Sequence, residues 1–159
     1  MMHAILTLLF IFVLTRWLRY EYPKKRVDAL KHWQWIAAAG LFQIFASILS
    51  VIFEGTVGNF LLHMIGGGVA SAFMFGYLLS VLKLRVNWRV EIVLLYAFVS
   101  ALGILNELAE YGAEFFGLGP FSLDAHDTWR DFVANTSGAL IAWALIKVAL
   151  LTKKHQPND

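Results

Sequence analysis

The long apolar runs are the feature that most constrains what this chain can fold into. A helix needs about 20 mostly apolar residues to cross the hydrocarbon core of a bilayer. Five segments meet or approach that requirement: Met2–Leu18, Trp33–Phe53, Thr56–Leu82, Ile92–Phe116 and Phe132–Thr152. Of the 159 residues, 59% are hydrophobic and 15% are charged, which excludes disorder and leaves too few polar side chains to cover a soluble domain. The sequence therefore predicts an all-α, polytopic membrane helix bundle of about five transmembrane helices.

The basic residues set the expected orientation. If five helices alternate, twelve of the thirteen Lys and Arg residues fall on one side of the membrane, and Arg130 is the exception. The positive-inside rule then places the N-terminus outside and the C-terminus in the cytoplasm. We expect one transmembrane helical domain over residues 1–152, a short cytoplasmic tail over 153–159, and a multi-pass location in the cytoplasmic (inner) membrane. His32 and Glu91, at cytoplasmic helix ends, are expected at the surface. Membrane lipids are the expected surroundings, and the net charge of +2 gives no reason to expect nucleic acid.

The acidic residues gather on the opposite, outer side. Seven of the eleven lie in or beside the outer loops or helix ends, namely Glu54, Glu107, Glu110, Glu114, Asp124, Asp127 and Asp131. At a helix rise of about 1.5 Å per residue, His63, Glu107 and Asp131 fall in one layer at or just under the outer interface. Ionisable groups at that depth avoid lipid, so we expect them to face the bundle interior or a water-filled cavity.

Residue spacing groups the acids into two stripes. Glu107, Glu110 and Glu114 follow an i, i+3, i+7 pattern, which places them on one helix face. The second stripe, which holds if the last helix begins early, comprises Asp124, Asp127, Asp131, Asn135 and Gly138. Asp124 and Asp127 equally suit the N-terminal cap of that helix, because acids are favoured there.

Crowded carboxylates repel one another, and a divalent cation, protons or basic partners relieve the repulsion. The candidate metal ligands are His63, Glu107, Glu110, Asp127 and Asp131. Imidazole with carboxylate suits Zn or Mn, whereas oxygen ligands alone suit Mg or Ca. Such a site could act on, or simply bind, a lipid-linked or cell-envelope phosphate, and Arg130 could pair with the acids or hold an anionic group. Whether the protein is an enzyme is left open.

A second hypothesis belongs to a different class. The protein could be a non-catalytic membrane subunit or assembly factor of a larger complex, or form a homo-oligomer, with the polar layer serving a structural role. The small residues Gly66, Gly67, Gly68 and Gly138 are expected to permit close helix packing. His63 would then be a packed histidine bonded to a neighbouring carbonyl, and the acids would mark the wet end of the helices.

Three motifs resemble those of bacterial inner-membrane families. The D-x-x-D-T-x-x-D pattern of YjdF-type proteins is similar to Asp124-Ala-His-Asp127-Thr128-Trp-Arg-Asp131. The E-x-x-E-aromatic motif of the same proteins resembles Glu107-Leu-Ala-Glu110-Tyr111, and their H-x-x-x-G motif resembles His63-Met-Ile-Gly-Gly67. Asp131, Asn135 and Gly138 also resemble the end of VanZ-like proteins.

The resemblance implies a small polytopic protein of the cell envelope, without a settled activity. Around the candidate ligands, the positions that would touch substrate or support the ligands are Asp124, Thr128, Arg130 and Asn135. The sequence departs from these families at Asn59 and Phe60, where they carry an Asp and a basic residue.

Overall fold

The computed structural model describes residues 32–118 and 125–154, together with Leu9, Phe12, Val13, Arg16, Trp17 and Tyr20. Its elements are α2 (Trp33–Phe53), α3 (Gly55–Leu61), the π-helix η1 (Leu62–Val69), α4 (Ala70–Leu82), α5 (Trp88–Phe115) and α6 (Ala125–Lys154). Every element in these ranges is helical, which confirms the all-α class. Most of the expected first span, Met2–Leu18, lies outside the described residues.

Four helices are long and apolar enough to cross a membrane: Trp33–Phe53, Gly55–Val81, Trp88–Phe115 and His126–Thr152. Large apolar side chains such as Leu41, Ile44 and Leu145 are more than half exposed on their outer faces, as expected for helices that face lipid. These observations support a multi-pass membrane protein. The fifth span and the orientation of the chain remain predictions.

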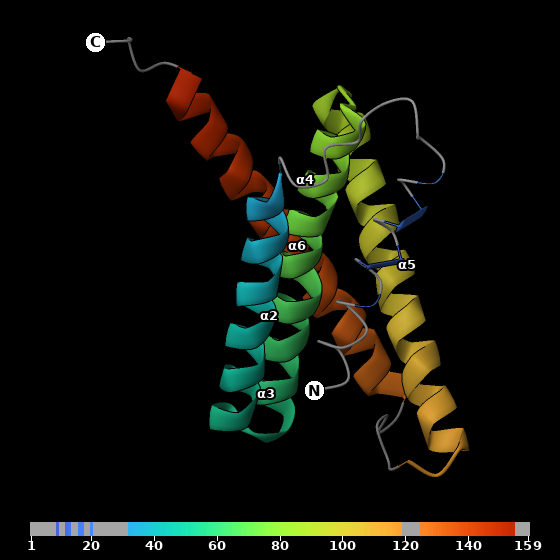
Figure 1. The fold of residues 1–159 in the computed structure, drawn as a ribbon. Coiled ribbons are helices and arrows are strands. Elements are labelled where there is room, and N and C mark those ends of the chain that lie inside the picture. The colour runs from blue at the N-terminus through green and yellow to red at the C-terminus, as the bar shows by residue number, and fades with distance from the viewer. Residues whose placement is uncertain are drawn as a thin grey trace.

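Successive spans run in opposite directions (Figure 1). A tight turn at Glu54 and Gly55, with φ angles of 37° and 57°, joins α2 to α3. The left-handed backbone at Gly55 suits a residue without Cβ. Beyond the turn, α3, η1 and α4 continue as one long span, α5 returns beside it, and α6 crosses the bundle obliquely (Figure 1). The ends of α2 and α5 and the starts of α3 and α6 therefore share one end of the bundle, which we call the acidic end.

The π-helix is a departure from the sequence prediction of one regular helix over Thr56–Leu82. Gly66, Gly67 and Gly68 occupy the second half of η1, and α6 packs more extensively on η1 than on any other element. A Cβ placed on Gly68 would lie 2.9 Å from the Ala139 nitrogen, with the Asn135 carbonyl oxygen closer still. The η1 and α6 backbones are therefore in direct contact, which only residues without a side chain allow.

The apolar core lies away from the acidic end. Its main cluster joins α4, α5 and α6 through buried residues, namely Ala72, Phe75, Leu95, Val99, Ala139 and Ala142. Three of these six residues are alanine, so the helices approach closely, and Phe75 packs against the ring of Phe98 at a centroid distance of 5.9 Å. This packing holds α5 and α6 together below the polar layer.

The expectation that Glu91 lies at the surface is wrong. It is 6% exposed, and its carboxylate accepts hydrogen bonds from Trp143 Nε1 at 2.9 Å and from Lys147 Nζ at 2.7 Å. The reason is that α5 begins at Trp88 rather than Ile92, so that Glu91 lies within the first helical turn and against α6. Trp143 and Lys147 are four residues apart and therefore share the α6 face that meets it.

Candidate functional site

The centre of the polar layer is a contact between His63 of η1 and Asp131 of α6. His63 Nε2 lies 3.2 Å from Asp131 Oδ2, and the two residues are 3% and 4% exposed. They are 68 positions apart in sequence and meet because η1 and α6 cross at their glycines. An imidazole nitrogen and a carboxylate oxygen at this separation share a hydrogen when the imidazole nitrogen carries it, and the pair becomes an ion pair when the ring is protonated.

Asn59 joins this pair to a second carboxylate. Its Nδ2 donates to Asp131 Oδ1 at 3.0 Å and lies 3.4 Å from Asp127 Oδ1. Sequence reasoning noted Asn59 only as a departure from the family pattern and missed its place in the site. The pattern that could have found it is the four-residue spacing between Asn59 and His63, which puts both side chains on one helix face.

The early start of α6 at Ala125 brings further members of the acidic stripe into the layer. Arg130 Nη2 lies 2.7 Å from Asp127 Oδ1, and Asp127 is 6% exposed. Thr128 Oγ1 donates to Glu107 Oε2 at 2.8 Å, which ties α6 to α5. Asp124 lies outside the described residues.

The acidic residues of the α5 stripe differ in how deeply they are buried. Glu110 is 7% exposed, and it accepts a hydrogen bond from Asn106 Nδ2 at 2.9 Å, one turn earlier on the same helix. Glu107 and Glu114 are half-buried. Asp131, Asp127, Glu107 and Glu110 lie close enough together that the other three repel the negative charge on Asp131.

The layer thus concentrates anionic groups in a poorly solvated environment. The groups that contact its carboxylates include the Arg130 guanidinium, the His63 imidazole and neutral donors from Asn59, Asn106 and Thr128. A buried charge that lacks compensation is costly. Within residues 32–118 and 125–154, and at the six described N-terminal positions, no group of three His, Asp or Glu side chains is arranged so as to hold a metal ion. The arrangement there offers His63 and Asp131 as a two-donor set.

A cavity of about 320 Å³ adjoins His63 toward the middle of the bundle. Asn135, on the α6 stripe one turn beyond Asp131, reaches it, as does Gln43 of α2. Gly66 and Gly67 also line the cavity, and these two glycines leave room for the amides, since a Cβ on Gly66 would lie 2.9 Å from Gln43 Nε2. Sequence reasoning missed Gln43, although a glutamine in the middle of a mostly apolar span is the kind of residue that indicates an interior polar contact.

No protein-family model, no curated protein and no solved structure matches this chain. The resemblance of its motifs to YjdF-type and VanZ-like proteins stays a prediction.

Proposed function

We propose that this protein binds a divalent cation in the polar layer at the acidic end of its membrane bundle, and that the cation holds the phosphate of a lipid-linked or cell-envelope molecule. The proposal places the protein in the cytoplasmic membrane with the acidic end outward. The observation that carries it is the buried contact between His63 and Asp131, which are 3.2 Å apart in a layer that also holds Asp127, Glu107 and Glu110.

The crowding of the acids supports a cation. Asp127 is paired with Arg130, and Asp131 lies 3.2 Å from the His63 imidazole and accepts a hydrogen bond from Asn59. Carboxylates that repel one another in a buried layer are stabilised by a bound cation or by protons. A divalent ion would neutralise two of these charges at once.

The spacing of the two central donors also fits. Ligands that each lie about 2.1 Å from one ion are roughly 3.0 to 3.4 Å apart in octahedral or tetrahedral geometry. His63 Nε2 and Asp131 Oδ2 fall within this range at 3.2 Å. Two protein ligands would leave further positions for water and phosphate oxygens, and a metal held by His63 and Asp131 would supply Lewis-acid stabilisation of the phosphate. The mixed nitrogen and oxygen donors favour Zn or Mn over Ca.

Metal content of the purified protein tests this proposal. Wild-type protein in lipid nanodiscs is equilibrated with Mn²⁺ or Zn²⁺, passed through a desalting column and analysed by elemental mass spectrometry. We expect one ion per chain in the wild type and at least about a tenfold lower affinity in Asp131→Asn and His63→Gln, because removing one of two protein ligands weakens the site by at least as much as losing a supporting group.

Glu54→Gln is the matched control, because it removes a carboxylate at the same end of the bundle from an exposed position. This control should keep the ion. Equal metal content in the wild type and in Asp131→Asn would refute the proposal and leave the layer as a hydrogen-bonded structural network.

A further inference from the structure

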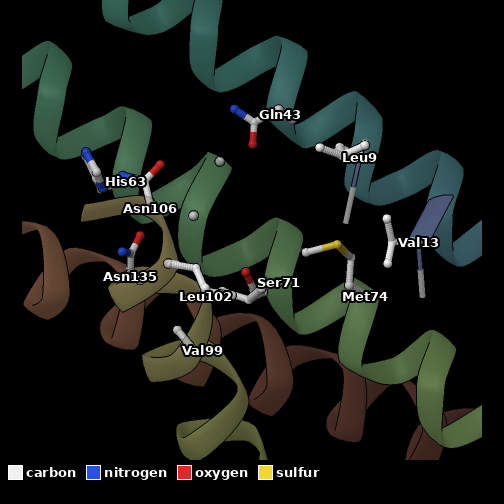
Figure 2. A pocket seen from close by; sticks show the side chains of 14 residues that line it. Leu9, Val13, Gln43, His63, Ser71, Met74, Val99, Leu102, Asn106 and Asn135 are labelled. Carbon is white, nitrogen blue, oxygen red and sulfur yellow. The ribbon is translucent and has the colours of Figure 1, made fainter. Parts of the chain in front are cut away.

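The cavity beside the polar layer is itself amphipathic. His63, Asn106 and Asn135 lie on one side of it, whereas Leu9, Val13 and Met74 lie on the other (Figure 2). Between these two groups the lining is mostly apolar. His63 and Met74 belong to the same span and are 11 residues apart, so the cavity follows that span for roughly 15 Å at helical rise. Its volume of about 320 Å³ is at the lower end of the range of small-molecule sites.

Two side-chain amides in the lining carry unsatisfied polar atoms. Across the described part of the chain, Gln43 Nε2 and Asn135 Oδ1 are the buried side-chain atoms without a hydrogen-bond partner. Gln43 is 4% exposed and Asn135 is 6% exposed. Leaving a buried donor or acceptor without a partner lowers stability, so both atoms indicate a group that is supplied from outside the chain.

We infer that this cavity binds a single-chain amphiphile with a neutral hydroxyl head, the hydroxyl bonding the Gln43 and Asn135 amides and the chain lying toward Met74. This adds a ligand to the proposed function, and it does not require the cation.

The chemistry of the two amides selects the head group. Gln43 Nε2 offers a donor and Asn135 Oδ1 offers an acceptor, and a hydroxyl both accepts and donates. An ether or a quinone ring only accepts, so it would leave Asn135 Oδ1 unsatisfied. A carboxylate or phosphate in the same place would also only accept, and it would lie next to a layer that already holds Asp131 and Glu110. The cavity therefore favours an alcohol over an anionic lipid head.

Photolabelling with a defined probe tests this inference. Wild-type protein in nanodiscs is irradiated with a dodecanol that carries a mid-chain diazirine, and the labelled peptides are identified by mass spectrometry. We expect labels in residues 63–74 and 99–106. Unlabelled 1-dodecanol should compete at least about five times better than 1-methoxydodecane, because the ether lacks the donor for Asn135, and dodecane should compete least.

Three variants and a metal arm complete the experiment. Gln43→Leu and Asn135→Leu should each reduce the preference of alcohol over ether, whereas Gln34→Leu, an exposed glutamine on the same helix, should leave it unchanged. Leu102→Trp, which adds volume to a lining residue, should reduce labelling at these peptides. Labelling in excess EDTA should equal labelling without it, which separates this inference from the cation site. Equal competition by alcohol, ether and alkane in the wild type would overturn the inference.

Discussion

Gly138→Ala tests whether direct contact between the η1 and α6 backbones builds the site. A Cβ on Gly138 would lie 2.9 Å from the Met64 carbonyl carbon, and the carbonyl oxygen would be closer still. Carbon atoms in ordinary contact are about 3.5–4.0 Å apart, so η1 and α6 must separate by at least about 0.6 Å to relieve the contact with this carbon, and by more to relieve the contact with the oxygen. Both neighbouring atoms belong to the backbone, so no side-chain rotation relieves the clash.

The expected loss of stability follows from two opposing terms. Overpacking a tight contact costs typically about 1–3 kcal/mol, and alanine gains roughly 0.8–1.0 kcal/mol over glycine in a helix. The helix-propensity gain is the same for any glycine inside a helix. Gly138→Ala should therefore be less stable, by about 1–3 kcal/mol, than the same substitution at a helical glycine that has open space around it. Met64 is adjacent to His63, so the same separation should also lengthen the contact between His63 and Asp131.

Reversible unfolding in mixed micelles, followed by tryptophan fluorescence while SDS is increased, measures this difference. Gly112→Ala is the matched control, because Gly112 lies within α5 and a Cβ there would meet nothing within 4 Å. The control should be as stable as the wild type or more stable, by up to about 1 kcal/mol. If Gly138→Ala unfolds at the same SDS fraction as Gly112→Ala, the close-contact argument is wrong.

Two further predictions use the same unfolding assay. Lys147→Met should lower the free energy of unfolding by about 1–3 kcal/mol, because Glu91 stays buried without its ammonium partner. Adding Glu91→Gln to this variant should recover part of the loss. If the losses of the two single variants simply add in the double variant, this reasoning is wrong. Asn59→Leu should lower the free energy of unfolding by about 1–3 kcal/mol, because it removes the amide donor from Asp131 and Asp127, and Asn87→Leu, which alters an exposed helix cap instead, shows how much an unrelated asparagine contributes.

The sequence predicted the four described spans well, because an apolar run is a local property. Trp33–Phe53 has the same bounds in the sequence prediction and in α2. The positions of the helix ends were predicted less well where a helix extends beyond its apolar run into polar residues. Residues before Phe132 belong to α6, which starts at Ala125, and Glu91 belongs to α5, which starts at Trp88. Charged residues at these ends lowered the local hydropathy, but their side chains are satisfied by partners on other helices.

The members of the polar layer could be grouped by spacing, but their partners could not. An i, i+4 relation shows that two side chains share a face and does not show which face of another helix they meet. The meeting of His63 with Asp131 depends on the crossing of η1 and α6 at Gly68 and Gly138. Asn59 has no charge and departs from the motif of the families that the chain resembles, so its contacts with two carboxylates could be found only from the three-dimensional arrangement.

The glycines of η1 help to decide between a purely structural layer and a binding site. Gly68 is explained by packing, because the α6 backbone lies against it. Gly66 and Gly67 are different, because they face the side-chain amides of Gln43 and Asn135. If this contact served only for packing, apolar side chains in place of the two amides would make it more stable. Each interior glycine costs roughly 0.8–1.0 kcal/mol compared with alanine, and each unsatisfied amide atom costs more. Both penalties, and a π-helical turn of the kind often found at functional sites, occur together at the polar side of one cavity. This coincidence is expected where stability has been given up for binding, and it favours a ligand site over a scaffold.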